Sequence, residues 1–400
     1  MSKELLSTKD SYYDSIRPYI DSEVQEVLPE LLEQPEVRGL MNHFFGGISE
    51  DQLRQMVQAS DSIANFKKIF LKPVVEKIIE SSAFSLSISG KRKLDRSGKE
   101  KYLFISNHRD IILDSGCLNY LMIEADMPMP RIAIGDNLLI KDWIYKLVRL
   151  ADAFIVKRKP SMREMLVESK RLSDYIRSSI GTDEASVWLA QSEGRRKNSD
   201  DRTQTAVLKM LTMSADKEEE LTDVLASLHI TPVSITYEYD PCDYLKAKEM
   251  LQKRLDPEWT KSQADDLINM QTGLTGQKGR IHFAIGDTIR DFSHSTQDQD
   301  KGGKNRQELV EDLAREIDRQ IFTNYRFYPN NYVAFDLLHG GQQFAHMYSP
   351  KEENTFRTYI EEQIAKVDAQ EEHREFILEK LLEMYATPLK NHLITTKQYR

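Results

Sequence analysis

The sequence predicts an α/β protein: a mostly parallel, twisted sheet covered by helices, with helical regions at both ends of the chain. Short β-like apolar runs alternate with longer stretches of helical spacing, an alternation typical of parallel sheets whose crossovers are helices. The stretches before the first run and after the last one carry mainly helical spacing. With 400 residues, 40% of them hydrophobic and 30% charged, the chain can bury a sizeable core.

We expect a helical N-terminal region over residues 1–82, because apolar side chains such as Val24 and Val27 recur there at helical spacing. Within it, residues 66–79 combine apolar and basic side chains, and Pro73 either interrupts or starts a helix. Two interpretations of this segment stay open. It is an anchor lying in a membrane surface, or a packed helix whose lysines extend to solvent.

A central α/β domain is expected over residues 83–300, followed by a helical region over residues 301–400. The boundary lies in a polar, glycine-containing stretch, residues 295–304, because a long helical pattern begins just after it at Gln307. The strand-like runs of the central domain are residues 84–89, 102–106, 131–134, 154–157, 187–191, 230–238 and 281–285.

Composition excludes several classes of protein. The formal net charge of −9 argues against a nucleic-acid partner, because binding to phosphates requires a large basic surface. Cys117 and Cys242 lie far apart without metal-type spacing, so we expect unreactive thiols, no metal site and no cofactor. The first residues do not resemble a signal peptide, and no run approaches the roughly 20 apolar residues of a spanning helix. We therefore expect a cytoplasmic protein whose membrane contact is peripheral, at the inner face of the cytoplasmic membrane.

One part of this acidic chain is locally basic. Between Arg131 and Arg171, ten lysines and arginines stand against five carboxylates. A surface formed by this segment can attract anions.

Residues 104–115 have the composition of a catalytic turn. An apolar strand runs into a polar turn that contains His108, and Asp110 and Asp114 follow closely. Transfer of an acyl group from a thioester to an alcohol needs a base of near-neutral pKa, for which imidazole is the natural candidate. A carboxylate that fixes the tautomer and stabilises the imidazolium completes such a site. Either aspartate can serve; we prefer Asp114, because Asp110 is well placed to cap the following helix.

This segment resembles the first sequence block of the glycerolipid acyltransferases, the family of glycerol-3-phosphate and 1-acylglycerol-3-phosphate acyltransferases. The signature of that block is Asn-His, four residues and Asp. Asn107 and His108 match it, whereas five residues separate His108 from Asp114. The resemblance implies that His108 is the catalytic base, that Asp114 or Asp110 is its partner, and that Asn107 belongs to the substrate site.

Further segments resemble the later blocks of this family in the same order. Residues 152–158 are similar to the second block, whose arginine contacts the acceptor phosphate and corresponds here to Arg158. Asp152 stands where the family usually has glycine. Residues 230–235 resemble the fourth block, a strand with an embedded proline that helps to form the acyl pocket.

The third block is similar to residues 190–196, in which Glu193, Gly194 and Arg196 match and Arg195 replaces a threonine. Arginines are suited to phosphate because the planar guanidinium offers two parallel donors, so Arg195 and Arg196 join Arg158 as candidate phosphate ligands. Glu193 would orient the acceptor or an arginine. Gly194 would let the backbone turn tightly or approach the substrate.

Together the blocks cover residues 104–235, about a third of the chain. The resemblance implies an O-acyltransferase of phospholipid biosynthesis that works at a membrane surface. Its donor would be acyl-CoA or acyl carrier protein, and its acceptor the hydroxyl of glycerol-3-phosphate, a lysophospholipid or a related lipid. A phosphate-free alcohol stays open as the acceptor, because the glycine of the second block is missing. Two rival functions also stay open: a non-catalytic protein that binds lipids or acyl thioesters, and a thioesterase.

Overall fold

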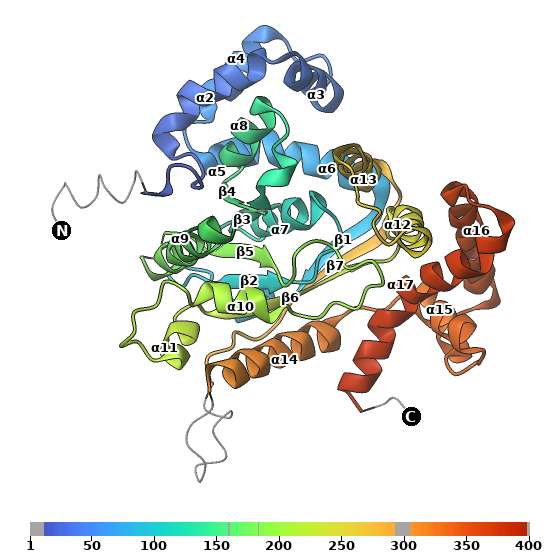
Figure 1. The fold of residues 1–400 in the computed structure, drawn as a ribbon. Helices are drawn as coiled ribbons and strands as arrows, with labels where there is room; N and C mark the ends of the chain where they lie inside the picture. Colours follow the sequence, from blue (N-terminus) through green and yellow to red (C-terminus); the bar gives the residue numbers. More distant parts are fainter. Residues whose placement is uncertain (1–11, 159–160, 183, 293–304, 398–400) are drawn as a thin grey trace.

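Seven strands form one sheet in the order β1-β7-β6-β2-β5-β3-β4 (Figure 1). The structure, a computed structural model, describes residues 12–158, 161–182, 184–292 and 305–397. The strands are β1 (Ala83–Ser89), β2 (Leu103–Ser106), β3 (Arg131–Gly135), β4 (Ala153–Val156), β5 (Val187–Ala190), β6 (Ile230–Tyr237) and β7 (Gly279–Ile285). The predicted fold, a mostly parallel sheet covered by helices with helical regions at both ends, is confirmed. The domain boundary predicted at residue 300 lies outside the described residues.

The direction of the strands decides where a site can form. Five of the six neighbouring pairs are parallel, and the β6–β7 pair is antiparallel. β2 and β6 are buried along their whole length, as expected of strands covered on both faces. Since β2, β3, β4, β5 and β6 all run in one direction, the loops that follow these strands meet at one edge of the sheet.

Helices cover both faces of this sheet (Figure 1). They are α6 (Lys72–Ser82), α7 (Leu113–Glu124), α8 (Asp142–Leu150), α9 (Met162–Gly181), α10 (Thr205–Leu211), α11 (Leu221–Ala226), α12 (Asp243–Leu255), α13 (Gln263–Thr275) and α14 (Arg306–Asn324). Leu103 and Ile105 of β2 point to one face and belong to the cluster that α9, α10 and α14 bury. Phe104 points to the other face and belongs to the cluster of α6 and α7.

The helices before the sheet form a separate apolar cluster at the top of Figure 1. They are α2 (Asp21–Glu33), α3 (Pro35–Phe45), α4 (Glu50–Ala59) and α5 (Ile63–Phe66). Leu150 of α8 belongs to the same cluster, so this region is joined to the sheet domain through an apolar contact.

The segment 66–79 is helical and packs against the protein. It consists of the end of α5, a π-helical turn over Lys67–Leu71 and most of α6, which begins next to Pro73. Phe66 and Phe70 are buried in the N-terminal cluster. The side chain of Lys67 is also buried, and its Nζ lies 3.3 Å from Oδ2 of Asp152. Burial lowers the pKa of Lys67, while the carboxylate of Asp152 opposes that shift.

The C-terminal helices pack with α12 around a further apolar cluster, at the right of Figure 1. They are α15 (Pro329–His339), α16 (Pro350–Val367) and α17 (Arg374–Thr395). Across the described ranges, we find no helix whose length and hydropathy would allow it to cross a membrane.

The turn after β1 depends on a glycine. Gly90 has a φ of +76°, and a Cβ there would lie 2.2 Å from the carbonyl oxygen of Ile285. We expect Gly90→Ala to lower the free energy of unfolding by about 1–3 kcal/mol, measured by urea denaturation. The control is Gly39→Ala, in the exposed middle of α3 with no atom within 4 Å, which should raise it by about 0.5–1 kcal/mol. A Gly90 variant as stable as the native chain would contradict this account of the turn.

Candidate active site

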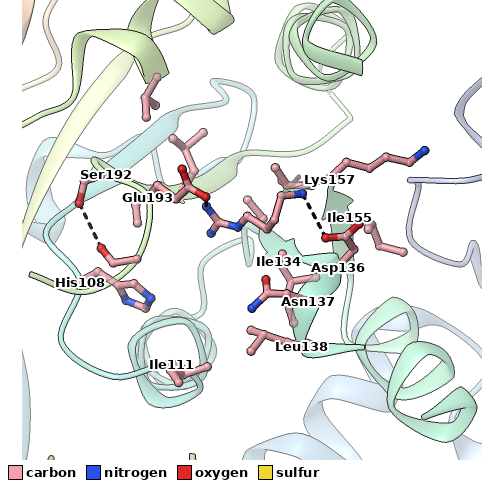
Figure 2. Close-up of a pocket in the computed structure, with 18 of the residues that line it drawn as sticks. His108, Ile111, Ile134, Asp136, Asn137, Leu138, Ile155, Lys157, Ser192 and Glu193 are labelled. Atoms are coloured by element: carbon pink, nitrogen blue, oxygen red, sulfur yellow. Dashed lines mark hydrogen bonds and ion pairs between the residues drawn. The ribbon is translucent and has the colours of Figure 1, made fainter. Parts of the chain in front are cut away.

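The loops that follow β2, β3, β4 and β5 surround a cavity of about 920 Å³. His108 comes from the loop after β2, Asp136 and Asn137 from that after β3, Arg158 from that after β4, and Glu193 from that after β5. In Figure 2, His108 lies across the cavity from Asp136 and Asn137. The parallel sheet thus brings together side chains from four separate parts of the chain.

Apolar and polar side chains share the remaining walls of the cavity. The apolar residues that line it are Ile16, Ile111, Ile132, Ala133, Ile134, Leu138, Phe154, Ile155, Val156, Leu172, Ile176, Trp188, Leu189, Ala190, Ala206, Val207 and Met210. None of the described residues of β6 is among the lining, so the fourth sequence block does not form this wall. A cavity that combines apolar walls with many polar groups suits a ligand that has a polar head and a hydrocarbon tail.

His108 is paired with a buried carboxylate. Its Nδ1 lies 2.7 Å from Oδ2 of Asp114, which is fully buried in the first turn of α7. The ring also meets Trp188 edge-on, with centroids 6.0 Å apart. If Nδ1–H is donated to the carboxylate, Nε2 keeps its lone pair and can accept a proton, while Asp114 stabilises the resulting imidazolium.

Asp114 also fixes the backbone of the turn that carries the histidine. Its Oδ2 accepts the backbone N–H of Arg109 at 2.6 Å and that of Asp110 at 3.1 Å. The same oxygen therefore holds both the peptide groups of the turn and the ring of His108. Five intervening residues, instead of the family's four, are accommodated because the turn wraps around this carboxylate.

Asp110 caps the helix and does not contact the imidazole. Its Oδ1 accepts the backbone N–H groups of Ile112 at 2.9 Å and Leu113 at 2.7 Å. Its other oxygen is packed so closely against α13 that a Cβ on Gly273 would lie 2.1 Å away. Burial, and then the negative charge of Asp114, raise the pKa of Asp110. Of the two candidate partners of the histidine, the structure places Asp114 in the pair.

The rest of the turn is bound to the protein interior. Asn107 is fully buried, and its amide exchanges two hydrogen bonds with the backbone of Ile235, at 2.9 and 2.7 Å. Arg109 is buried too; it forms an ion pair with Asp201 and donates to Ser199 Oγ at 2.8 Å. Asn107, which the sequence suggested as a substrate ligand, therefore faces β6 and not the cavity. Its physical role here is to hold the turn against the sheet.

Three of the predicted substrate residues meet on the cavity wall. Nη1 of Arg158 lies 3.5 Å from Oε1 of Glu193. The backbone N–H of Arg158 donates to Oδ1 of Asp136 at 3.1 Å. The guanidinium crosses Gly135, where a Cβ would come within 2.6 Å of Nε. Gly194, with a φ of +74°, makes the tight turn that the sequence suggested. Arg158, Glu193 and Gly194 all line the cavity.

Of the two neighbouring arginines of the third block, only one lines the cavity. Arg195 lines the cavity, and its Nη2 donates to Oδ1 of Asn269 at 2.9 Å. Its Nη1 is buried and has no hydrogen bond to oxygen or nitrogen within the described part of the chain. Arg196 is not among the lining residues, and its Nη2 reaches the carbonyl of Arg202 at 3.4 Å. A ligand in the cavity would therefore meet Arg195 and not Arg196.

Sequence reasoning missed some of the polar lining residues, notably Lys197, Asp136 and Asn137. Nζ of Lys197 lies 2.6 Å from Oε2 of Glu249, and burial lowers the pKa of Lys197 to about 8 despite that partner. Two signals could have found these residues. Lys197 extends a run of basic residues, and Asp136 and Asn137 directly follow a strand whose carboxyl end lies at the same edge.

Other chemistries find little support in the described residues. Cys117 and Cys242 are both free and buried, and burial raises the pKa of Cys117 well above its ordinary value and that of Cys242 to about 11. Such thiols are poor nucleophiles. Within the described ranges, no group of three or more His, Cys, Asp or Glu side chains is arranged to hold a metal ion.

Comparison with known proteins agrees with this geometry. A protein-family model described as Acyltransferase matches residues 85–236, from β1 to the end of β6. Dihydroxyacetone phosphate acyltransferase of Bos taurus is 25% identical over 225 residues, which are 56% of this chain and 30% of that protein. The Homo sapiens protein of the same name is 24% identical over the same coverage. Over residues 85–236 the chain is thus similar to acyltransferases that act on glycerolipid precursors.

The chain aligns with less than a third of the length of these curated relatives. Among solved structures, the 1-acyl-sn-glycerophosphate (LPA) acyltransferase PlsC of Thermotoga maritima aligns with 74% of this chain and 93% of that one. Its sequence identity is 12% and its TM-score 0.31. The likeness to acyltransferases therefore rests on the sequence matches.

The departure of residues 152–158 from the second block has a physical explanation. Asp152, where the family usually has glycine, adopts a φ of +66°. Aspartate tolerates this left-handed conformation better than most residues. Its carboxylate also lies between Lys67 and Arg131, at 3.3 and 3.5 Å. The glycine is thus replaced by a residue that keeps the backbone turn and pairs with a buried lysine.

Substitutions of Asp114 and of Asp110 should have different effects on activity. We expect Asp114→Asn to lower kcat by roughly 10²–10⁴-fold, because the imidazolium loses its negative partner. Asp110→Asn should retain most of the activity, because the amide oxygen can still cap α7. The measurement is thiol release from an acyl thioester, with thermal melting of both variants as a check on folding. Equal losses in two folded variants would count against the assigned roles.

Proposed function

We propose that the protein transfers a fatty acyl group from a thioester to the hydroxyl of a phosphate-bearing, glycerol-type acceptor. The observation that carries this proposal is the pair of His108 and buried Asp114 at a cavity with apolar walls and cationic side chains. The apolar walls suit the acyl chain, and the imidazole suits activation of a hydroxyl. The match of residues 85–236 to an acyltransferase family supports the same reaction.

The reaction needs no covalent enzyme intermediate. Nε2 of His108 takes the proton of the acceptor hydroxyl as its oxygen forms a bond to the thioester carbonyl carbon. The tetrahedral intermediate then collapses, the C–S bond breaks, and the leaving thiolate takes the proton from Nε2. Asp114, bound to Nδ1, stabilises the imidazolium between these two steps. Holding both substrates in one cavity supplies the remainder of the rate enhancement.

The basic side chains of the lining, which stand beside acidic ones such as Asp136 and Glu193, favour an acceptor that carries phosphate. Arg158, Arg195 and Lys197 line the cavity, and Arg195 keeps a guanidinium nitrogen free of oxygen and nitrogen partners within the described residues. Guanidinium groups bind phosphate through paired, charge-assisted hydrogen bonds. The named substrate of the curated relatives, dihydroxyacetone phosphate, is such an acceptor. Glycerol-3-phosphate and lysophosphatidate present the same combination of hydroxyl and phosphate.

The donor, the pathway and the location are part of the same proposal. Acyl-CoA and acyl carrier protein both present the acyl group on a thioester arm, so either can serve a cavity of this kind. The product would enter glycerolipid and phospholipid biosynthesis. The enzyme would work in the cytoplasm as a peripheral protein on the inner face of the membrane, where acceptors and products with acyl chains reside.

The test is thiol release from palmitoyl-CoA and from palmitoyl-acyl carrier protein, by the native chain and by His108→Ala. The acceptors are glycerol-3-phosphate, dihydroxyacetone phosphate, lysophosphatidate and neutral lipid alcohols. We expect release that depends on a phosphorylated acceptor and that falls by roughly 10²–10⁴-fold in the variant.

The other outcomes identify the rival functions. Release without any acceptor would make the protein a thioesterase. Retention of the thioester without release, for both donors and every acceptor, would leave a binding protein. Release confined to neutral alcohols would keep the acyltransferase but overturn the phosphate-bearing acceptor.

Arg195 and Arg196 provide a matched test of the phosphate site. We expect Arg195→Gln to raise KM for glycerol-3-phosphate by roughly ten- to hundredfold, because a charge-assisted hydrogen bond to phosphate is lost. Arg196→Gln should leave KM unchanged, because that side chain lies away from the cavity. Initial rates across acceptor concentration measure both. A rise in KM for Arg196→Gln alone would reverse this assignment.

A further inference from the structure

The first two turns of α9 (Met162–Gly181) leave their apolar side chains uncovered. Every residue from 161 to 167 is exposed, although this stretch contains four large apolar side chains. Met162 is 87% exposed, Leu166 66%, Val167 54% and Met165 50%. Scattered exposed apolar residues are ordinary, but four of them within six positions on one helix end mark an interaction surface.

This apolar end is continuous with the proposed active site. Met162, Met165 and Leu166 lie on the face of α9 that also carries Leu172 and Ile176, by the periodicity of the helix. Leu172 and Ile176 line the cavity. The helix therefore presents one stripe that is exposed at its first turns and becomes the wall of the cavity two to three turns later.

The charge around this end fits an anionic surface. The described basic residues from 157 to 171 are Lys157, Arg158, Arg163, Lys170 and Arg171, whereas the acidic ones are Glu164 and Glu168. Glu168 is already paired with Lys157 and Arg171, at 3.4 and 3.3 Å. This segment is thus net positive in a chain whose formal charge is −9. Apolar side chains flanked by lysine and arginine are typical of helices that lie in the surface of an anionic membrane.

We propose that the exposed end of α9 docks on an anionic lipid bilayer, with Met162, Met165 and Leu166 inserted among the headgroups. The docked helix brings the mouth of the cavity to the lipid surface, so that an acyl chain enters or leaves along the stripe. This inference rests on the proposed function for the ligand that passes between bilayer and cavity. A bilayer fits better than a protein partner, because the uncovered methionine and leucine side chains are flexible and lie beside lysine and arginine.

Vesicle sedimentation of the full-length protein tests the docking surface. We expect the native chain to bind vesicles of equal parts phosphatidylcholine and phosphatidylglycerol more tightly than vesicles of phosphatidylcholine alone. Met162→Ser/Leu166→Ser should weaken binding to the mixed vesicles by roughly tenfold or more. The matched control is Leu255→Ser/Met347→Ser, which removes two exposed apolar side chains outside α9 and the cavity lining and should bind like the native chain.

A second measurement separates docking from chemistry. Thiol release from octanoyl-CoA with glycerol-3-phosphate, without vesicles, should be the same for the native chain and both variants, which shows that the active site is intact. If no variant releases thiol but Met162→Ser/Leu166→Ser alone loses vesicle binding, the docking surface stands and the proposed function fails. The docking proposal is overturned if that variant binds vesicles as tightly as the native chain, or if the native chain binds none. It is also overturned if α9 proves to bind acyl carrier protein instead.

Discussion

The site depends on the need to satisfy one buried negative charge. Asp114 is fully buried at the start of α7, where an uncompensated carboxylate would be strongly unfavourable. Its Oδ2 is compensated by the backbone N–H groups of Arg109 and Asp110 and by the ring of His108. The orientation of the histidine and the shape of the turn are therefore two results of the same interaction. An imidazole held in this way is oriented before any ligand arrives.

The surrounding structure holds that turn from several sides. Asn107 binds the backbone of β6, Arg109 pairs with Asp201, and Asp110 caps α7 while its other oxygen lies against Gly273 of α13. These contacts come from segments as far apart in the sequence as residues 107 and 273. Loss of any one of these contacts would make the position of His108 less fixed, although none of them involves its imidazole. Many polar residues of this region therefore hold the turn in place and do not contact a ligand.

The parallel sheet connects the chemistry to the lipid that the protein is proposed to use. Strands that share a direction deliver their polar loops to one edge, where His108, Arg158 and Glu193 meet around the cavity. α9 follows one of those strands, so its first turns lie beside the same edge and its later turns wall the cavity. A base, a cationic lining and an apolar path thus arise from one topological feature. The antiparallel β6–β7 pair lies on the side of β2 away from the other site strands.

Local sequence by itself determined the strands, the alternation with helices, and the polar turn around His108, because hydrophobic periodicity and turn composition depend on neighbouring residues. It suggested Asp114 but left Asp110 possible, and it offered both Arg195 and Arg196 as phosphate ligands without showing which one faces the cavity. It also left residues 66–79 between a membrane anchor and a packed helix. The tertiary structure decided these points, because each depends on partners distant in the sequence: Asp152 for Lys67, Asn269 for Arg195 and Gly273 for Asp110. Burial and distance between such segments are properties of the packed chain, and no local pattern encodes them.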